Sequence, residues 1–377
     1  MIPYNRPHLT GRELSYIQQA ADAGQLAGNG LFTKRCQEWL QSRIGAPRVL
    51  LTHSCTAALE MSALLLDLEP GDEVIMPSFT FVSTANAFVL RGATPVFVDI
   101  RRDTLNIDER LIEAAITPRT RAILPVHYAG VGCDMDAIRA IADRHGLAVV
   151  EDAAQGLLAA YRGKPLGSMG QLAALSFHET KNVICGEGGA LIVNDERLAD
   201  RAEIIWEKGT NRSRFFRGQV DKYTWVDLGS SYLPGELIAA FLWAQLEEAA
   251  AMTEARLALW RRYEAASAPL AELGITGPQI PADRTHNAHL FYVLLPPHVP
   301  QARVIADLKA RGIMAVFHYV PLHASPAGRR FGRAAGAMDV TDEVSARLVR
   351  LPLWLGMAET APDMVVEQLS AAVAAHV

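Results

Sequence analysis

The sequence predicts an α/β protein, with a mostly parallel sheet of the seven-stranded type in a large domain and a smaller α+β domain at the C-terminal end. Seven short apolar segments alternate with helix-patterned segments as far as residue 195. The apolar segments are almost continuously hydrophobic, which is typical of strands covered on both faces. Beyond Pro234 the pattern changes to long helical stretches. The length of 377 residues suits two domains, which we expect over residues 1–245 and 246–377.

Two helices are expected before the first strand. The first covers ELSYIQQAADAG (13–24) and follows Thr10 and Glu13, which have the spacing of a capping box, and the second covers FTKRCQEWLQSR (32–43). The predicted strands share short length and β-branched or aliphatic residues. They are RVLLTH (48–53), DEVIMPS (72–78), TPVFVDI (94–100), RAILPV (121–126), LAVVED (147–152), LAALSF (172–177) and GALIVND (189–195). Between them, CTAALEMSALLLD (55–67) and DMDAIRAIADRHG (134–146) have helical patterns.

The C-terminal part begins with helical patterns over residues 234–252 and 253–274, with no strand pattern between them, so we expect a connecting helix. Further elements follow in an α+β order: a strand in HNAHLFYVLLPP (286–297), a helix in ARVIADLKARG (302–312), a strand in IMAVFHYV (313–320) and a helix in APDMVVEQLSAAVAAH (361–376).

Composition excludes several classes of function. Lys and Arg number 36 against 41 Asp and Glu, a net charge of -5, which does not favour a nucleic-acid partner. The four cysteines form no CxxC pair, and the first residues lack the pattern of a secretory signal, so we expect a reduced, cytoplasmic setting. The longest uncharged apolar stretch, residues 237–246, is about half of the roughly 20 residues of a membrane span, so no membrane partner is expected.

Three local patterns carry chemistry. In VVEDAAQG (149–156) a strand delivers Asp152 to its carboxyl end, where ligands bind in open α/β sheets. Lys181 follows another strand and precedes a GEGG turn; most lysines in turns are solvated, but a desolvated amine has a lowered pKa and can form a Schiff base. In THSCTAALE (52–60) a strand leads into a helix N-terminus, which either is an ordinary cap or binds phosphate. Together these are the parts of a pyridoxal phosphate (PLP) site.

The order of several motifs resembles the DegT/DnrJ/EryC1/StrS sugar aminotransferases, which are PLP enzymes of fold type I. The motifs are GDEVIMPSFTF, EDAAQ, SFHETK followed by GEGG, and the C-terminal HYVPLH. The resemblance spans nearly the whole chain. Longer strings are similar to the branch that makes dTDP-4-amino-4,6-dideoxygalactose: EVIMPSFTFVSTANAFVLRGA, LPVHYAG, EKGTNRSRFFRGQVDKYTW and GSSYL.

The resemblance implies a set of site residues. Lys181 would hold PLP covalently and move protons, and Asp152 would pair with the pyridinium nitrogen. The other cofactor residues it implies are Gln155 near the phenolic oxygen, Phe81 stacked on the ring, and Thr56, Ala57 and Ser176 at the phosphate. His323 would lie near the sugar. Many family members have an asparagine, which reaches the neighbouring subunit's cofactor phosphate, where this chain has Ser231, so Ser231 is a candidate for that contact.

The segment from Lys208 to Trp225 is dense in cationic and aromatic residues. It is either a solvated loop or a grip on the diphosphate and base of a nucleotide-sugar, with Arg212 and Arg217 as the candidate ligands.

The function that the resemblance implies is transamination of dTDP-4-keto-6-deoxy-D-glucose to dTDP-4-amino-4,6-dideoxy-D-galactose, with glutamate as amino donor. A homodimer with shared active sites is implied as well, in lipopolysaccharide O-antigen or enterobacterial common antigen biosynthesis. Two alternatives stay open. One is an aminotransferase that makes the 4-amino-4,6-dideoxyglucose epimer or acts on a 3-keto sugar nucleotide. The other, from a different class, is a noncatalytic sugar-nucleotide-binding regulatory protein.

Overall fold

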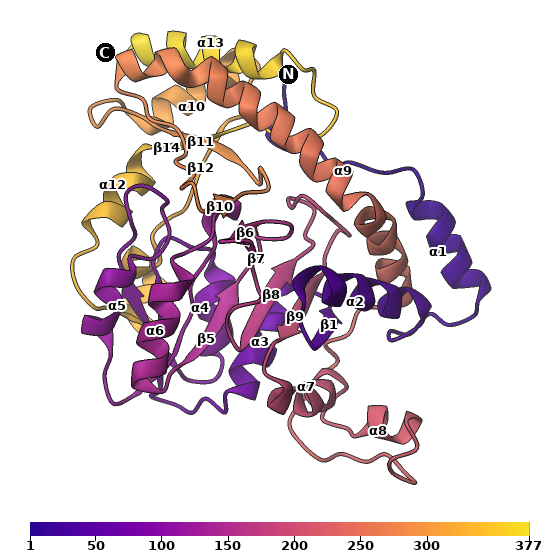
Figure 1. Cartoon of the computed structure of the whole chain (residues 1–377). Helices are drawn as coiled ribbons and strands as arrows, with labels where there is room; N and C mark the ends of the chain where they lie inside the picture. Colours follow the sequence, from indigo (N-terminus) through magenta and orange to yellow (C-terminus); the bar gives the residue numbers. More distant parts are fainter. Residues whose placement is uncertain (377) are drawn as a thin grey trace.

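The large sheet has eight strands in the order β1-β9-β8-β5-β4-β2-β3-β13 in a computed structural model that describes residues 1–376 (Figure 1). From β13 to β8 every neighbouring pair is parallel, and β9 is antiparallel to both β8 and β1. The strands are β1 (Arg48–Thr52), β2 (Glu73–Pro77), β3 (Thr94–Val98), β4 (Thr120–Ile123), β5 (Ala148–Asp152), β8 (Leu172–Ser176), β9 (Gly189–Val193) and β13 (Arg333–Ala334). The mostly parallel sheet is therefore confirmed. The eighth strand, β13, was not predicted, because two residues carry no periodic pattern.

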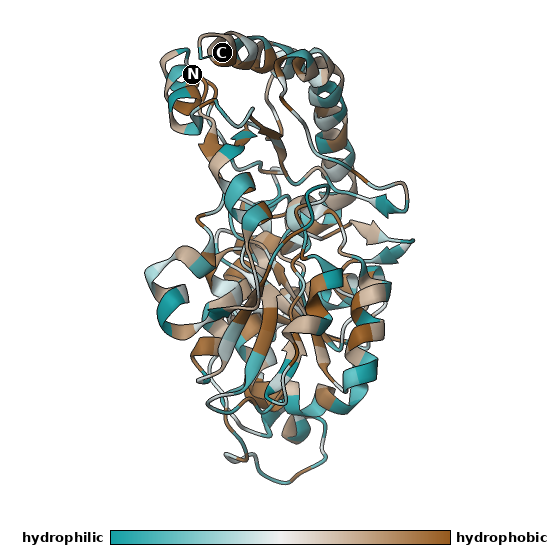
Figure 2. Ribbon diagram, turned by 90° about the vertical axis from the view of Figure 1, so that its left-hand side faces the viewer, coloured by the Kyte–Doolittle hydropathy of each residue, from teal (hydrophilic) through white to brown (hydrophobic). Residues whose placement is uncertain are grey.

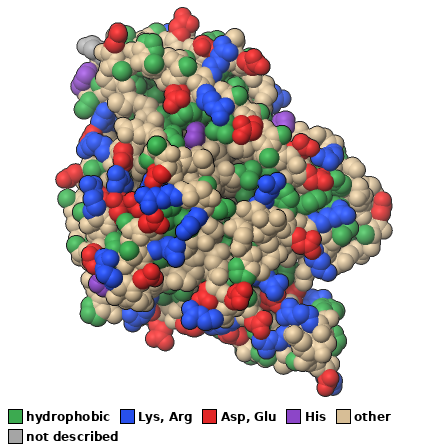
Figure 3. All heavy atoms as spheres, viewed as in Figure 1, with side chains coloured by type: hydrophobic (Ala, Val, Ile, Leu, Met, Phe, Trp, Pro, Cys, Tyr) green, Lys and Arg blue, Asp and Glu red, His purple; other side chains and the backbone are tan. Residues whose placement is uncertain are grey.

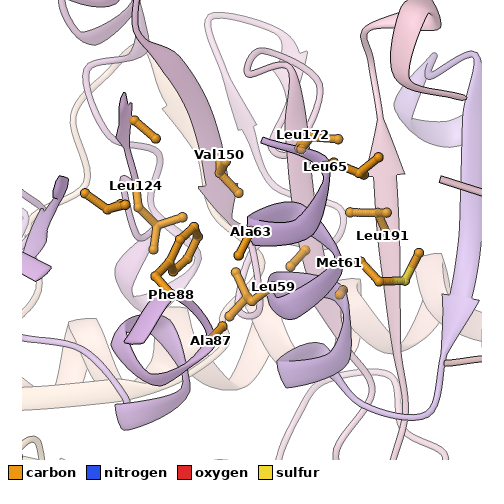
Figure 4. Close-up of a cluster of buried hydrophobic side chains, with 14 of the residues drawn as sticks. Leu59, Met61, Ala63, Leu65, Ala87, Phe88, Leu124, Val150, Leu172 and Leu191 are labelled. Carbon is orange, nitrogen blue, oxygen red and sulfur yellow. The ribbon is translucent and has the colours of Figure 1, made fainter. Parts of the chain in front are cut away.

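Helices cover both faces of this sheet, as the continuously apolar strands require. On one face lie α3 (Cys55–Leu65), α4 (Val82–Val89) and α7 (Ala199–Trp206), which share a hydrophobic core with Val150, Leu172 and Leu191. Figure 4 shows the side chains that α3 and α4 contribute to this core. The other face carries α2 (Leu31–Ile44), α5 (Glu109–Ala115) and α6 (Met135–His145). Neighbours along a strand therefore enter different cores, as Val149 and Val150 do. In Figure 2 the strands form a brown hydrophobic centre between more mixed helices.

The C-terminal part is joined to the rest by α9 (Glu236–Ser267), one continuous helix of 32 residues where two helical stretches were read from the sequence. It packs with a three-stranded sheet of order β11-β14-β12 (Figure 1). The elements of this part are β11 (Phe291–Leu294), α10 (Gln301–Ala310), β12 (Val316–Phe317), α11 (Pro326–Phe331), α12 (Asp339–Arg347), β14 (Leu348–Leu351) and α13 (Ala361–Ala374). The central strand β14 was not predicted. The expected domain boundary between residues 245 and 246 falls inside α9 and stays a prediction.

The remaining elements are short. They are α1 (Glu13–Asp22), α8 (Arg212–Phe216), the three-stranded sheet of β6 (Ala160–Tyr161), β7 (Lys164–Pro165) and β10 (Arg284–Thr285), and four 3₁₀ turns over residues 128–130, 196–198, 268–273 and 322–324. Only half of the expected capping box forms at α1: the Glu13 carboxylate accepts from Thr10 N–H at 2.7 Å, but no side chain caps the helix. Charges of both signs are mixed over the face in Figure 3. Among residues 1–376, no helix combines the length and apolar character of a membrane span.

A distant carboxylate satisfies the N-terminus of α2. Glu236, only 2% exposed, accepts from the N–H groups of Gly30 (2.9 Å), Phe32 (2.8 Å) and Thr33 (3.1 Å), and from the Thr33 hydroxyl. These are helix-terminal donors with no partner inside the helix. The contact therefore fastens the start of α9 to α2.

Replacing Glu236 by alanine should lower the free energy of unfolding by about 3 kcal/mol, because buried donors lose a charged acceptor. Urea unfolding followed by circular dichroism measures this loss. Glu254→Ala, an exposed carboxylate on the same helix, is the matched control and should change stability by less than about 0.5 kcal/mol. Equal stability of the two variants would contradict the capping role.

Candidate active site

A cavity of about 740 Å³ lies at the carboxyl ends of β5 and β8. Its walls are the large sheet, the N-terminus of α3, and strands β12 and β14 of the C-terminal three-stranded sheet. This is the position at which open α/β sheets bind ligands. Six residues predicted for the cofactor line it: Thr56, Phe81, Asp152, Gln155, Ser176 and Lys181. They come from four separate segments of the chain, so the tertiary fold brings these six residues together.

Lys181 lies in the loop between β8 and β9, and its backbone N–H donates to the carbonyl of His178 at 2.8 Å. The side chain faces the cavity. Burial lowers the pKa of Lys181, the nearby Asp152 carboxylate partly opposes this, and the positive charge of Arg350 lowers it further. Lys181 is therefore partly buried in the cavity, unlike most lysines in turns, which are solvated. A larger fraction of the amine is unprotonated, which is the form that attacks a carbonyl.

Asp152 ends β5 and is 5% exposed. One carboxylate oxygen accepts from the Thr84 hydroxyl at 2.8 Å and the other from the Ala154 N–H at 3.1 Å. Because the Thr84 hydroxyl donates its proton to Asp152, the Thr80 hydroxyl 2.8 Å away must donate to Thr84. All these donors are neutral, so the carboxylate is held in place while its charge remains available to a cation in the cavity.

The Gln155 side chain is fixed at both ends. Its carbonyl oxygen accepts from the Ala129 N–H at 2.7 Å, and its amide nitrogen donates to the Tyr319 hydroxyl at 3.1 Å. Tyr319 lines the cavity as well. The structure therefore offers the Gln155 amide and the Tyr319 hydroxyl side by side, and the second of these was not predicted from the sequence.

The N-terminus of α3 faces the cavity through Ser54, Cys55 and Thr56. The Ser54 hydroxyl caps the helix by accepting from Ala57 N–H at 3.1 Å, so this N–H is already used. The Cys55 and Thr56 N–H groups have no partner among the described residues and lie at the positive end of the helix dipole. A bound phosphate would satisfy them.

Two predicted residues flank these donors. Phe81, the residue before α4, lines the cavity with its ring 59% exposed. Ser176 ends β8, and its hydroxyl accepts from His178 N–H at 3.4 Å.

Five other candidates do not line the cavity of this chain. Ala57 belongs to α3 and is buried. Ser231 is exposed and forms a β-bridge with Glu207. The remaining three have other partners: the Arg212 guanidinium lies 5.1 Å from the Phe216 ring, Arg217 donates to Glu203 at 2.8 Å, and His323 Nδ1 lies 2.7 Å from the Ser78 hydroxyl. The functional roles given to these residues stay predictions.

Some of the residues that line the cavity without having been predicted come from the N-terminal segment and the C-terminal part. They include Tyr4, Arg256, His289, Tyr319 and Arg350. Tyr319 lies within the HYVPLH motif, which could have drawn attention to it. No quoted motif contains Tyr4, Arg256 or Arg350, which reach the cavity only through long-range folding.

The residues present fit a PLP group: around one cavity lie a lysine with a lowered pKa, a buried carboxylate that forms no ion pair among residues 1–376, and helix N-terminal N–H groups without a partner in the same range. The fold and this site define a PLP-dependent aminotransferase of fold type I. The model of the DegT/DnrJ/EryC1/StrS aminotransferase family matches residues 7–370. The chain therefore belongs to this family of PLP-dependent sugar aminotransferases.

Relatives agree with this assignment. The spore coat polysaccharide biosynthesis protein SpsC of Bacillus subtilis (strain 168) is 34% identical, over 97% of this chain and 95% of its own. The structure of S. venezuelae DesV in complex with a ketimine intermediate has a TM-score of 0.89 and 32% identity, covering 99% of this chain and 98% of that one. The PLP form of Spr1654 from Streptococcus pneumoniae has a TM-score of 0.91 and 25% identity, covering 100% and 99%.

Proposed function

We propose that this aminotransferase converts dTDP-4-keto-6-deoxy-D-glucose to dTDP-4-amino-4,6-dideoxy-D-galactose, with glutamate as the amino donor. The observation that carries the catalytic part is Lys181, with its lowered pKa, in the same cavity as Asp152. The sugar and its C4 position are supported by motif strings such as EVIMPSFTFVSTANAFVLRGA and EKGTNRSRFFRGQVDKYTW. The product would feed a glycan such as O-antigen or common antigen, and the cysteines suit a reduced cytoplasm.

Lys181 has two tasks in this proposal. Its amine would hold PLP covalently, and once released it would accept the proton from the amine-bearing carbon of the substrate. PLP supplies an electron sink that makes this carbon acidic. A lysine with a lowered pKa suits both tasks, because the neutral amine attacks and then accepts a proton near neutral pH.

The cofactor's other contacts follow from the cavity walls. Asp152 would keep the ring nitrogen protonated, with Thr84 and Ala154 N–H fixing the carboxylate. Gln155 and Tyr319 would face the phenolic oxygen, and Phe81 would cover one face of the ring. Thr56 and Ser176 would bind the phosphate at the start of α3.

We place the nucleotide-sugar at the mouth of this cavity, in a homodimer whose two subunits share the sites. Exposed apolar side chains at this mouth, Phe81 (59%), Phe317 (54%) and Val320 (61%), support a surface covered by a second subunit or by substrate. The diphosphate and base of the nucleotide-sugar would be bound by Arg212 and Arg217, together with the exposed Phe216 and Trp225. These residues would act in the site of their own subunit or in that of the neighbouring subunit. Ser231 and His323 remain candidates in that shared site.

The absorption spectrum of the purified holoenzyme tests the proposal. We expect the visible band of the lysine-bound cofactor to disappear with glutamate and to return with dTDP-4-keto-6-deoxyglucose, in ping-pong fashion. NMR coupling constants of the product should show the galacto configuration at C4. The gluco product, or turnover with a 3-keto sugar alone, would support the alternative aminotransferase. If no visible band forms after addition of PLP, the result contradicts catalysis and supports the alternative of a noncatalytic sugar-nucleotide-binding protein.

A further inference from the structure

The cavity has more positive than negative side chains. Lys181, Arg256 and Arg350 face it, against the carboxylates of Asp152 and Glu187. The buried histidines add no charge at neutral pH, since burial lowers the pKa of both His289 and His318 well below the usual value. The Glu187 carboxylate lies 3.6 Å from His178 Nε2. A substrate that enters this cavity would therefore gain from carrying an anionic group.

Arg350 is the cation with donors left over. It lies in β14, where one Nη donates to the Phe317 carbonyl at 3.1 Å and the guanidinium stacks 4.8 Å from the centre of the Tyr4 ring. Its Nε is buried and has no hydrogen-bond partner among the described residues. A guanidinium has five N–H donors, and a buried unpaired donor is costly. The guanidinium is thus fixed in position, and its Nε lacks an acceptor among the described residues.

The second arginine of the cavity, Arg256, already donates hydrogen bonds to backbone carbonyl groups. Arg256 in α9 donates through Nε to the Ala288 carbonyl at 3.1 Å and through Nη to the His289 carbonyl at 2.8 Å, and it is 5% exposed. It fastens the segment before β11 to α9. Arg350 is therefore the better candidate for binding an anion.

The position of Arg350 decides between the two anions that the proposed function brings to the site. Arg350 and Lys181 line the same cavity, Arg350 from β14 and Lys181 from the loop after β8, so one bound substrate can reach both side chains. The α-carboxylate of an amino acid is attached to the carbon that bears the reacting amine. The diphosphate of a nucleotide-sugar is attached to C1, across the ring from C4. A cation in the same cavity as Lys181 is therefore placed for the carboxylate.

We propose that Arg350 binds the α-carboxylate of the amino-acid donor through paired hydrogen bonds, with Tyr4 and the Phe317 carbonyl holding the guanidinium in position. This inference rests on the proposed function. Arg350 would orient the donor so that its amine faces the cofactor carbonyl and its α-hydrogen faces Lys181. Since every α-amino acid has this carboxylate, Arg350 acts on the donor class and leaves the choice among amino acids to other contacts.

Half-reactions of the holoenzyme test this role. In Arg350→Gln the glutamate concentration that half-saturates bleaching of the cofactor band should rise about 10- to 100-fold, the usual effect of losing a charge-assisted pair. With alanine as the amino donor, the half-saturating concentration should rise by the same factor in Arg350→Gln, because alanine has the α-carboxylate of glutamate but no side-chain carboxylate. The half-reaction of the pyridoxamine form with the keto sugar should stay within about 2-fold. Arg350→Lys should recover part of the loss, since lysine keeps the charge without the fork.

A binding measurement adds a readout without turnover. Calorimetric titration of the PLP form with 2-oxoglutarate, which has the carboxylate but no amine, should show a dissociation constant raised by a similar factor in Arg350→Gln. Arg311→Gln is the matched control: this exposed arginine bonds Gln368 outside the cavity and should leave both half-reactions unchanged. Tyr4→Leu should raise the half-saturating glutamate concentration by a smaller factor, about 3-fold.

Unchanged donor kinetics in Arg350→Gln, with an intact cofactor band and circular dichroism spectrum, would overturn the inference. So would a loss in the sugar half-reaction as large as that with glutamate, which would assign Arg350 to the diphosphate. Absence of the glutamate half-reaction in the wild type is a different result, because then the proposed function fails and this inference fails with it.

Discussion

Replacing Lys181 by methionine should reduce kcat by about 10⁴-fold or more, because one substitution removes both the covalent link to the cofactor and the group that moves the proton. Methionine has a similar length and no charge, so it fills the space of the lysine stem. Single-turnover absorbance with glutamate measures the loss, and the visible band of the lysine-bound cofactor should be absent. A rate within 10-fold of the wild type would show that another group performs these tasks.

Stability of the cofactor-free variant separates a chemical from a structural role for Lys181. Burial lowers the pKa of Lys181 in the folded state below the ordinary value of 10.5. The cost of burying the charged amine is then fully present below the folded-state pKa and disappears as pH rises toward 10.5. Lys181→Met should therefore be more stable than the wild type in urea at pH 7, and this advantage should shrink at pH 10. An unstable variant would instead indicate a structural lysine.

Replacing Asp152 by asparagine should reduce kcat by about 10³-fold, since a neutral amide cannot stabilise a protonated ring nitrogen. The shape and size of the side chain are kept, and the Thr84 hydroxyl can still donate to the amide oxygen. Steady-state kinetics with glutamate and the keto sugar measure this loss, and the cofactor absorbance titrated against pH should show an altered spectrum. The reduction should appear in both half-reactions.

Two variants serve as controls for Asp152. Thr84→Val removes one neutral hydrogen bond and should cost about 5- to 10-fold in kcat, far less than loss of the charge. Glu187→Gln removes the other cavity carboxylate, which lies beside His178, and should change kcat by less than about 3-fold. If Glu187→Gln reduced kcat as much as Asp152→Asn, the effect would come from net charge in the cavity rather than from the ring nitrogen.

Strand positions and the order of the site motifs could be predicted from the sequence, because both depend on neighbouring residues. The apolar run that ends in Asp152 is a buried strand wherever it packs, and its carboxyl end is the ligand-binding edge. Two-residue strands such as β13 carry no periodicity. The central strand β14 followed helix α12 without a turn pattern, so it was missed.

The sequence by itself therefore determined the α/β class, the predicted strands of the large sheet and the placement of Asp152 and Lys181 at strand ends, since local hydrophobic pattern controls these. Only the tertiary structure decided that Lys181 faces a cavity and is partly buried, that Glu236 caps a helix more than 200 residues away, and that Tyr4 and Arg350 meet at the cavity. Burial, pKa and unpaired donors depend on segments that approach only when the chain folds. No window of residues contains that information.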